Sequence, residues 1–283
     1  MSRNLAVGFT IGAVCAAAAM LAPLRAADNA KVPDFSSNNA AWTSIGGDNE
    51  FTAPKSGIGP VKDDPAHPYV SNFRARRTGE QPNWRVADLN NPNLKPWVVE
   101  SLRKANADAL AGKAMFTREA RCWATGVPAM LLNPGSLFFI QTPKQVVIVQ
   151  ESDHRVRHVY LNMPHSKNPA QSWYGESVGH YENGDTLVVD TIGQNDKTFV
   201  DSYRTPHTDK IHVVERFKLI NGGKGLEVSF TVDDPGAFNR PWSGSKPYQR
   251  TEGPLEEDAC AENNDGYFGY DVEPIPQAQK PDF

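Results

Sequence analysis

Alternation of apolar and polar residues runs through the second half of the chain and predicts β-strands. Seven segments carry this pattern or a short run of β-forming residues: 137–142, 145–151, 155–161, 177–182, 185–191, 211–219 and 226–234. Asn183-Gly184 separates two of these segments and is a strong signal for a hairpin turn. Short strands joined by tight turns indicate an antiparallel barrel or a sandwich.

A helix is predicted to begin at Pro96. An apolar stripe at helical spacing marks its buried face, and Gly112 provides its stop. The stripe consists of Val98, Leu102, Ala105 and Ala109.

Outside this core the chain has the composition of irregular segments. Residues 27–94 are rich in Pro, Asn, Gly and Asp, and their aromatic residues show no period, which predicts an arm wrapped over the core. From Pro235 onward the chain is rich in Pro and Gly and is predicted to be draped over the core. We therefore expect a helix and a mainly β, antiparallel barrel in residues 95–250, followed by a tail in residues 251–283.

The first residues have the three parts of a secretory signal. A basic start at Arg3 is followed by an uncharged, apolar stretch over residues 4–24 and by a small-residue exit at Ala26. The alternative is a membrane anchor, because about twenty apolar residues can span a bilayer. The many alanines and Pro23 favour cleavage. Residues 1–26 are therefore predicted to be a signal peptide, and the mature protein to be periplasmic or secreted.

Charge and hydropathy limit the partners that the protein can have. The whole chain has a formal net charge of −4, and the predicted signal removes Arg3 and Arg25 but no acidic residue, so the mature protein is more acidic. Mild acidity argues against a nucleic-acid partner, which requires a basic face. After residue 26 no apolar stretch is long enough to cross a membrane.

Two cysteines remain after the predicted cleavage, Cys122 and Cys260. Well-separated thiols in a secreted chain commonly pair in an oxidising compartment. A bridge between them would tie the start of the β region to the tail. The alternative is two buried, unpaired thiols.

The last predicted hairpin places a carboxylate among apolar side chains. Because strand side chains alternate between faces, matching the two apolar faces pairs Phe217 with Val228 and puts Glu215 opposite Phe230. A carboxylate there is costly unless it is paired or protonated, and Arg157 is the partner that we expect. Buried ionisable groups often mark functional sites, although structural ion pairs produce the same pattern.

The Asn183-Gly184 hairpin leaves two interpretations open. A two-residue turn pairs Tyr181 with Thr186 and Ser177 with Asp190. One face then carries Ser177, Gly179, Tyr181, Thr186, Val188 and Asp190, and the other carries Val178, His180, Leu187 and Val189. If the first face lines the interior, its hydroxyl and carboxyl groups form a polar binding site. Otherwise it is a solvated outer face.

The sequence offers little support for a serine hydrolase or for a metal site. Residues 175–179 match the G-x-S-x-G motif of α/β-hydrolases, with His207 following in the hydrolase order, but a hairpin strand follows where that motif requires a helix. His154 and His158 lie about 13 Å apart if they share a strand. Neither H-E-x-x-H nor Cys-x-x-Cys is present. We therefore predict no metal site and no cofactor.

An ordered series of short motifs resembles a large family of secreted bacterial proteins that have no assigned activity. The series lies within residues 84–248 and consists of Arg121-Cys122, Gly126-Val127-Pro128, Gln141-Thr142-Pro143, Arg157, Tyr160, His165, residues 173–179, residues 184–191, Pro206-His207-Thr208, residues 212–217, Asp233-Asp234-Pro235 and Pro241-Trp242. Two positions depart from the family pattern: Glu176 stands where the family usually shows His, and Tyr181 where it shows Trp. If that histidine serves in chemistry, this chain has lost it or has changed its substrate.

The resemblance implies a lipocalin-like (calycin-type) β barrel but supplies no substrate. Among the residues in its motifs, we expect Glu215 or Asp190 to act as general base. Arg157 is expected to clamp an anion or carboxylate, and His165 and Tyr181 to donate protons. The remaining candidates for ligand binding are Tyr160, Trp173, Ser177 and His207.

The function that we expect is binding of a small, partly aromatic or apolar molecule by a periplasmic β barrel. Whether the protein also converts that molecule by cofactor-free acid–base chemistry, of lyase or isomerase type, is left open. One alternative is a carrier without chemistry. Another is an interaction or structural protein of the cell envelope whose interior is only packed.

Overall fold

The computed structural model of the protein describes residues 32–36, 39–46, 50–113, 122–152 and 155–257. The predicted signal peptide and Cys260 lie outside these residues. Cleavage after Ala26 and the bridge to Cys122 therefore stay predictions.

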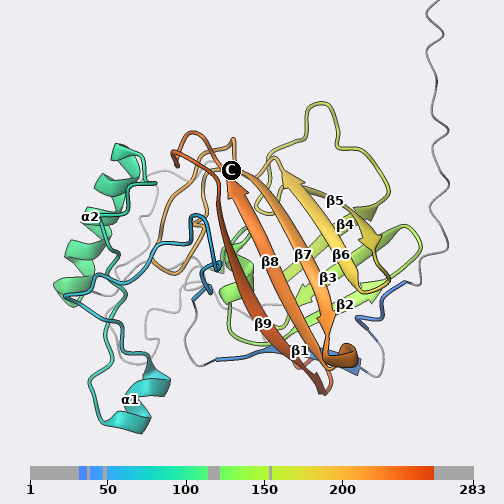
Figure 1. The fold of residues 1–283 in the computed structure, drawn as a ribbon, viewed down its shortest axis with the longest axis horizontal. Helices are drawn as coiled ribbons and strands as arrows, with labels where there is room; N and C mark the ends of the chain where they lie inside the picture. Colours follow the sequence, from blue (N-terminus) through green and yellow to red (C-terminus); the bar gives the residue numbers. More distant parts are fainter. Residues whose placement is uncertain (1–31, 37–38, 47–49, 114–121, 153–154, 258–283) are drawn as a thin grey trace, which may run out of the picture. The chain divides into compact units, whose positions relative to one another are not determined.

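Nine strands of the described residues form one closed barrel, in which spatial neighbours follow the order of the chain (Figure 1). They are β1 (Ala40–Ser44), β2 (Leu137–Gln141), β3 (Gln145–Gln150), β4 (Arg155–Leu161), β5 (Glu176–Glu182), β6 (Thr186–Ile192), β7 (His212–Ile220), β8 (Gly225–Asp233) and β9 (Trp242–Glu252). β9 pairs with β1 and closes the barrel. The protein is mainly β, as predicted.

Strands β2 to β8 are the seven segments that the sequence pattern predicts, and their bounds agree within one residue at each end. The register of the last hairpin is also confirmed, because Phe217 lies opposite Val228 and Glu215 opposite Phe230. One pairing differs from an all-antiparallel barrel: β4 and β5 are parallel. The long connection over residues 162–175 carries the chain back along the sheet, which a parallel pair requires.

Two strands correct the predicted arm and tail. β1 lies in the segment that we predicted to be an irregular arm, and β9 begins in the segment predicted to be draped. Both strands contain few β-branched residues, so local pattern does not reveal them. They pair with each other, and β9 also pairs with β8, which leaves the closed barrel without an open edge.

The predicted helix is α2 (Pro96–Leu110), and it begins at the proline as expected. Val98, Leu102 and Ala109 are buried, and so is Asn106, which the apolar stripe does not predict. The Asn106 amide donates to the carbonyl of Ala87 and accepts from its N–H, which explains why a polar side chain occupies the buried face. A short helix, α1 (Asn72–Thr78), lies in the predicted arm and is capped by the Ser71 hydroxyl.

Segments outside the strands contribute side chains to the barrel core. The 3-10 helix η3 (Ala129–Leu132) is buried along its whole length, and its Leu131 carbonyl accepts a hydrogen bond from the Tyr248 hydroxyl at 2.8 Å. Phe35 is buried as well and stacks on Phe139 with ring centroids 5.2 Å apart. A second 3-10 helix, η5 (Asn221–Gly223), joins β7 to β8.

The Asn183-Gly184 hairpin has a longer loop than the two-residue turn that we considered. Both residues have positive φ, as the turn requires, but Asp185 stays in the loop and Glu182 pairs with Thr186. The register is therefore shifted by one, and Ser177 lies opposite Thr191 rather than Asp190. The inward face carries Ser177, Gly179, Tyr181, Leu187, Val189 and Thr191. This register buries the side chains of Leu187 and Val189 and turns Asp190 outward.

Candidate functional site

A buried ion pair lies at the centre of the barrel interior. Arg157 is 1 % exposed and Glu215 is fully buried, and Arg157 Nη2 donates to Glu215 Oε2 at 2.5 Å. The alternating burial of β4 and β7 shows why: each residue occupies an inward position of its strand. The pairing expected between these two residues is present.

Three further groups fix the guanidinium. Its Nε donates to Ser177 Oγ at 3.1 Å, and its Nη2 also donates to Thr191 Oγ1 at 2.7 Å. The two hydroxyl oxygens are 2.9 Å apart and share one hydrogen bond. On the other side Nη1 lies 3.7 Å from the Met130 sulfur of η3. Arg157 is therefore held from two neighbouring strands and from the inserted helical turn.

The carboxylate of Glu215 is less completely satisfied than the guanidinium. Among the residues that the structure describes, its Oε1 has no hydrogen-bond partner. The phenol of Tyr248 is also buried, and burial, with the charge of Glu215 as a smaller cause, raises the pKa of Tyr248 above its usual range. Tyr248 is thus held neutral, and its proton goes to the Leu131 carbonyl rather than to Glu215.

Asp190 and His165 form a separate cluster on the outer side of the barrel. His165, in the loop before β5, places Nε2 at 3.0 Å from Asp190 Oδ1 and Nδ1 at 3.0 Å from Glu176 Oε1. When both carboxylates are ionised, only the doubly protonated ring can donate to both. His212 Nε2 also contacts the same Asp190 oxygen, at 2.8 Å. A half-exposed carboxylate therefore joins two histidines.

Glu176 anchors the 162–175 loop to β5. Its carboxylate accepts hydrogen bonds from the Ser166 hydroxyl and backbone N–H, and from His165. The Ser166 contacts, followed by that of His165, lower the pKa of Glu176 below its ordinary value. Glu176 thus has a structural role on the outer surface.

The structure divides the predicted site residues between these two places. The interior holds Glu215, Arg157 and Ser177, whereas Asp190 and His165 meet outside. Asp190 and Glu215 occupy opposite sides of the sheet, because Asp190 adjoins Val189 in the chain and the Val189 position faces inward opposite Glu215. With three residues in the hairpin loop, Thr191 rather than Asp190 lies opposite the inward Ser177.

Tyr181 lies at the inward side of β5 and is half-buried. Its hydroxyl accepts a hydrogen bond from Gln141 Nε2 at 2.9 Å, and burial raises its pKa. The Gln141 side chain also binds the backbone at Pro33 and Phe35. Tyr181 therefore helps to hold the segment that carries the buried Phe35 ring.

The remaining candidates do not lie at the ion pair. Tyr160 is exposed on the outer face of β4. Trp173 packs against Trp123, with ring centroids 5.5 Å apart. His207 is buried, with Nε2 at 2.6 Å from Thr198 Oγ1 and Nδ1 at 2.9 Å from a backbone carbonyl. Both ring nitrogens of His207 thus form hydrogen bonds within the loop between β6 and β7.

Packing explains the G-x-S-x-G match. A Cβ on Gly175 would lie 2.3 Å from the Ile192 carbonyl oxygen, and a Cβ on Gly179 would lie 2.6 Å from the Val188 carbonyl oxygen. Both glycines therefore permit β5 to approach β6. Ser177 between them bonds to Arg157 and Thr191, and it lies on a strand rather than on a turn into a helix.

Sequence reasoning missed Thr191, Met130 and Tyr248 as neighbours of the ion pair. Alternation along β6 could have found Thr191 had the loop length been known. Met130 lies in an apolar run without strand periodicity, and Tyr248 lies in a segment that we predicted to be draped. No local signal distinguishes either residue.

No group of three or more His, Cys, Asp or Glu side chains in the described part of the chain is arranged to hold a metal ion. No helix of the described residues is both long and apolar enough to cross a membrane. Comparison of the chain with family models, curated proteins and solved structures gives no match.

Proposed function

We propose that the protein binds a small, partly aromatic or apolar molecule inside the barrel, and that Glu215 accepts a hydrogen bond from it. The observation that carries this proposal is the lack of a partner for Glu215 Oε1 among the described residues, in a side chain that is fully buried. An unsatisfied buried acceptor costs about 1–3 kcal/mol, and more when it is charged. A ligand donor would remove that cost.

The surroundings of Glu215 support a ligand with an apolar body. Its neighbours on the inward faces of β7 and β8 are Val213, Phe217, Phe230 and Val228. Such a lining suits an aromatic or aliphatic skeleton, while one polar group fixes its orientation. The lipocalin-like barrel that the resemblance implies is a fold that can hold one small ligand.

The ion pair favours a neutral donor over an anion, which changes the role expected for Arg157. The charge of Arg157 already faces Glu215, and its other donors reach Ser177 and Thr191. An anionic ligand that approached Glu215 Oε1 would be repelled by the charge of the Glu215 carboxylate. We therefore propose a phenol or an alcohol, with the hydroxyl donating to Glu215 Oε1.

A thermal-shift screen of the protein against phenols, terpenoid alcohols and aromatic acids tests the proposal. We expect phenols or alcohols to raise the melting temperature, and matched aromatic acids to have a smaller effect. Calorimetry on the double variant Arg157→Met/Glu215→Leu should then show loss of binding in a folded barrel. Glu227→Gln, on the exposed face of β8, is the matched control and should bind normally. Undiminished binding by the double variant would refute the role of Glu215.

Acid–base conversion of the bound molecule is a second proposal for the same site. Glu215 Oε1, which in this proposal accepts a hydrogen bond from the ligand, is also placed to accept a proton from the ligand. A general base requires this property. Incubating the protein with a bound compound and following it by NMR separates an enzyme from a carrier. An unchanged compound would leave binding without catalysis.

We also propose that the protein acts in the periplasm or outside the cell. The basic start, apolar centre and small-residue exit of residues 1–26 support this location. Mature protein should begin at or near Ala27. An intact mass that still includes Met1, found in the membrane fraction, would favour an anchor.

A further inference from the structure

Trp242 carries a second buried polar atom without a partner in the barrel interior. Its side chain is 3 % exposed, and its Nε1 has no hydrogen-bond partner within the part of the chain that the structure describes. An indole N–H can only donate a hydrogen bond, whereas an ionised carboxylate can only accept one. Trp242 Nε1 and Glu215 Oε1 are therefore complementary, and buried polar atoms of this kind are rare enough to require an explanation.

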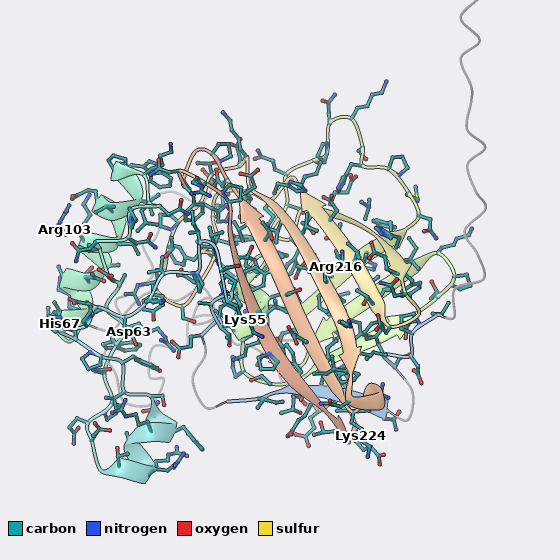
Figure 2. All side chains as sticks on the ribbon, viewed as in Figure 1. Lys55, Asp63, His67, Arg103, Arg216 and Lys224 are labelled. Atoms are coloured by element: carbon teal, nitrogen blue, oxygen red, sulfur yellow. The ribbon has the colours of Figure 1, made fainter. Side chains whose placement is uncertain are left out.

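Both side chains lie on the inner side of the barrel. On β7 the buried Glu215 precedes the exposed Arg216 (Figure 2), because strand side chains alternate between faces. Burial alternates on β9 as well, and Trp242 shares its buried face with Tyr248, whose hydroxyl reaches the Leu131 carbonyl in the core. The N–H of Trp242 and the carboxylate of Glu215 thus lie on the same side of the sheet.

The strand register places the two groups in neighbouring rows of the interior. Trp242 shares its row with Val213 of β7, two residues before Glu215. The row continues to Thr191 of β6, whose hydroxyl accepts a hydrogen bond from Arg157 of the buried ion pair. Two strand spacings separate β7 from β9, which is about 10 Å between their backbones. This interval is on the scale of one aromatic ring with a polar group on either side.

Phe230 of β8 supplies an apolar surface between the two groups. It lies opposite Glu215 on one side and opposite Gly244 of β9 on the other. Its ring leans toward β9, because a Cβ on Gly244 would lie only 2.7 Å from Phe230 Cζ. The same ring packs edge-on against Trp242, with ring centroids 5.6 Å apart. The ring therefore lies on the Trp242 side of β8 rather than over the carboxylate of Glu215.

We propose that one ligand bridges Glu215 and Trp242, and that it is a phenol with an oxygen acceptor, such as a ketone, at the end opposite the hydroxyl. This inference rests on the proposed function and narrows its ligand class. The hydroxyl donates to Glu215 Oε1, the far oxygen accepts from Trp242 Nε1, and the aromatic ring packs along Phe230. Such a ligand satisfies both buried atoms, whereas a simple phenol leaves the Trp242 N–H without a partner.

The N–H of Trp242 gives the site a preference that a purely apolar pocket does not have. A carbonyl group that enters an apolar interior loses its hydrogen bonds with water, so an apolar pocket favours an alkyl group at the same position. A buried donor reverses this order, because the carbonyl then accepts a hydrogen bond inside the protein. The relative affinity of a ketone and its alkyl analogue therefore reports whether Trp242 Nε1 contacts the ligand.

Isothermal titration calorimetry of the full chain with two matched phenols tests the inference. The phenols are 4-(4-hydroxyphenyl)butan-2-one and 4-butylphenol, in which the same carbon chain carries or lacks the carbonyl. Methylene groups separate the carbonyl from the ring, so the two phenol hydroxyls have nearly the same acidity. We expect the ketone to bind about tenfold more tightly than 4-butylphenol.

Trp242→Phe removes the N–H and keeps an aromatic ring. It should lower the affinity for the ketone about tenfold and leave the affinity for 4-butylphenol unchanged, so that the preference disappears. Trp97→Phe is the matched control, because the Trp97 N–H donates to the Gly236 carbonyl and its ring is 44 % exposed. The control should leave both affinities unchanged.

A ketone that binds no more tightly than 4-butylphenol would overturn the inference and leave the proposed phenol site standing. A preference that persists in Trp242→Phe, or an equal loss of affinity for both phenols, would also overturn it, because the indole N–H would then not contact the ketone. If neither phenol binds, the failure lies in the proposed function, and the inference falls with it. Melting curves establish that the variants are folded. If Trp242→Phe does not fold, the comparison of the two phenols on the wild type decides.

Discussion

Arg157 of β4 and Glu215 of β7 are 58 residues apart in the chain, yet their charged groups meet at 2.5 Å in the barrel core. Removing two charges from water costs several kcal/mol for each ion, and their attraction repays this only when the remaining polar atoms are also satisfied. Arg157 meets that condition through Ser177 and Thr191, and Glu215 does not, because its Oε1 lacks a partner among the described residues. Stabilisation of the fold alone therefore does not explain this ion pair.

Glu215→Gln should destabilise the protein by about 3–5 kcal/mol, because it leaves the buried Arg157 without its counter-charge. The double variant Arg157→Met/Glu215→Leu should recover most of this loss, since it removes both charges and keeps apolar volume. Chemical denaturation of the three proteins measures both effects. A double variant that is less stable than Glu215→Gln would mean that the ion pair is needed for folding.

Glu176 should make stability depend on pH in the acid range. Hydrogen bonds from Ser166 and His165 lower its folded-state pKa below the ordinary value of 4.5, so the unfolded chain binds the proton more tightly. The contribution is therefore present above pH 4.5 and is lost as the pH falls through the lower folded-state pKa. Melting temperatures of the wild type and Glu176→Gln should differ most near neutral pH and converge on acidification. A difference that is constant with pH would contradict this role.

Thiol labelling can verify the register of the Asn183-Gly184 hairpin. The Asp190 side chain is 40 % exposed, whereas Thr191 is fully buried. In native protein Asp190→Cys should react rapidly with a maleimide, and Thr191→Cys should react only after unfolding. Wild-type protein provides the background from its own cysteines. Reversed reactivity would indicate the two-residue turn.

Gly179→Ala should be destabilising, because its Cβ would lie 2.6 Å from the Val188 carbonyl oxygen and 2.8 Å from a Val159 methyl group. Backbone cannot move aside as a flexible side chain can, and overpacking in a core costs about 1–3 kcal/mol. Gly253→Ala is the control, since nothing lies within 4 Å of a Cβ there. Denaturant midpoints for both variants should separate them, and equal midpoints would argue against the close approach of β5 and β6.

The predicted bridge between Cys122 and Cys260 can be measured directly. Non-reducing digestion should release the two cysteines in one linked peptide, and reduction should lower the melting temperature. A loop of this length would contribute about 4–5 kcal/mol in the chain-entropy model. Two free thiols per chain in unreduced protein would reject the bridge.

The sequence by itself determined most of the strands and one hairpin register. Alternation over residues 211–219 and 226–234 carries enough apolar side chains on one face that a slip by one residue would expose all of them. This constraint is local, and it placed Glu215 correctly among apolar neighbours. The same kind of constraint fixed α2, through Pro96 and its apolar stripe.

Only the tertiary structure decided the rest, because the deciding interactions join segments that are distant in the chain. The sequences of β1 and β9 show little strand pattern of their own. They form strands because their backbones pair with each other and with neighbouring strands, which closes the barrel. The sequence left open which face of the Asn183-Gly184 hairpin is inward. In the closed barrel the register differs by one from a two-residue turn, and burial of Leu187 and Val189 turns Asp190 outward. The free oxygen of Glu215 likewise depends on which groups from other strands reach it, and no local pattern encodes that.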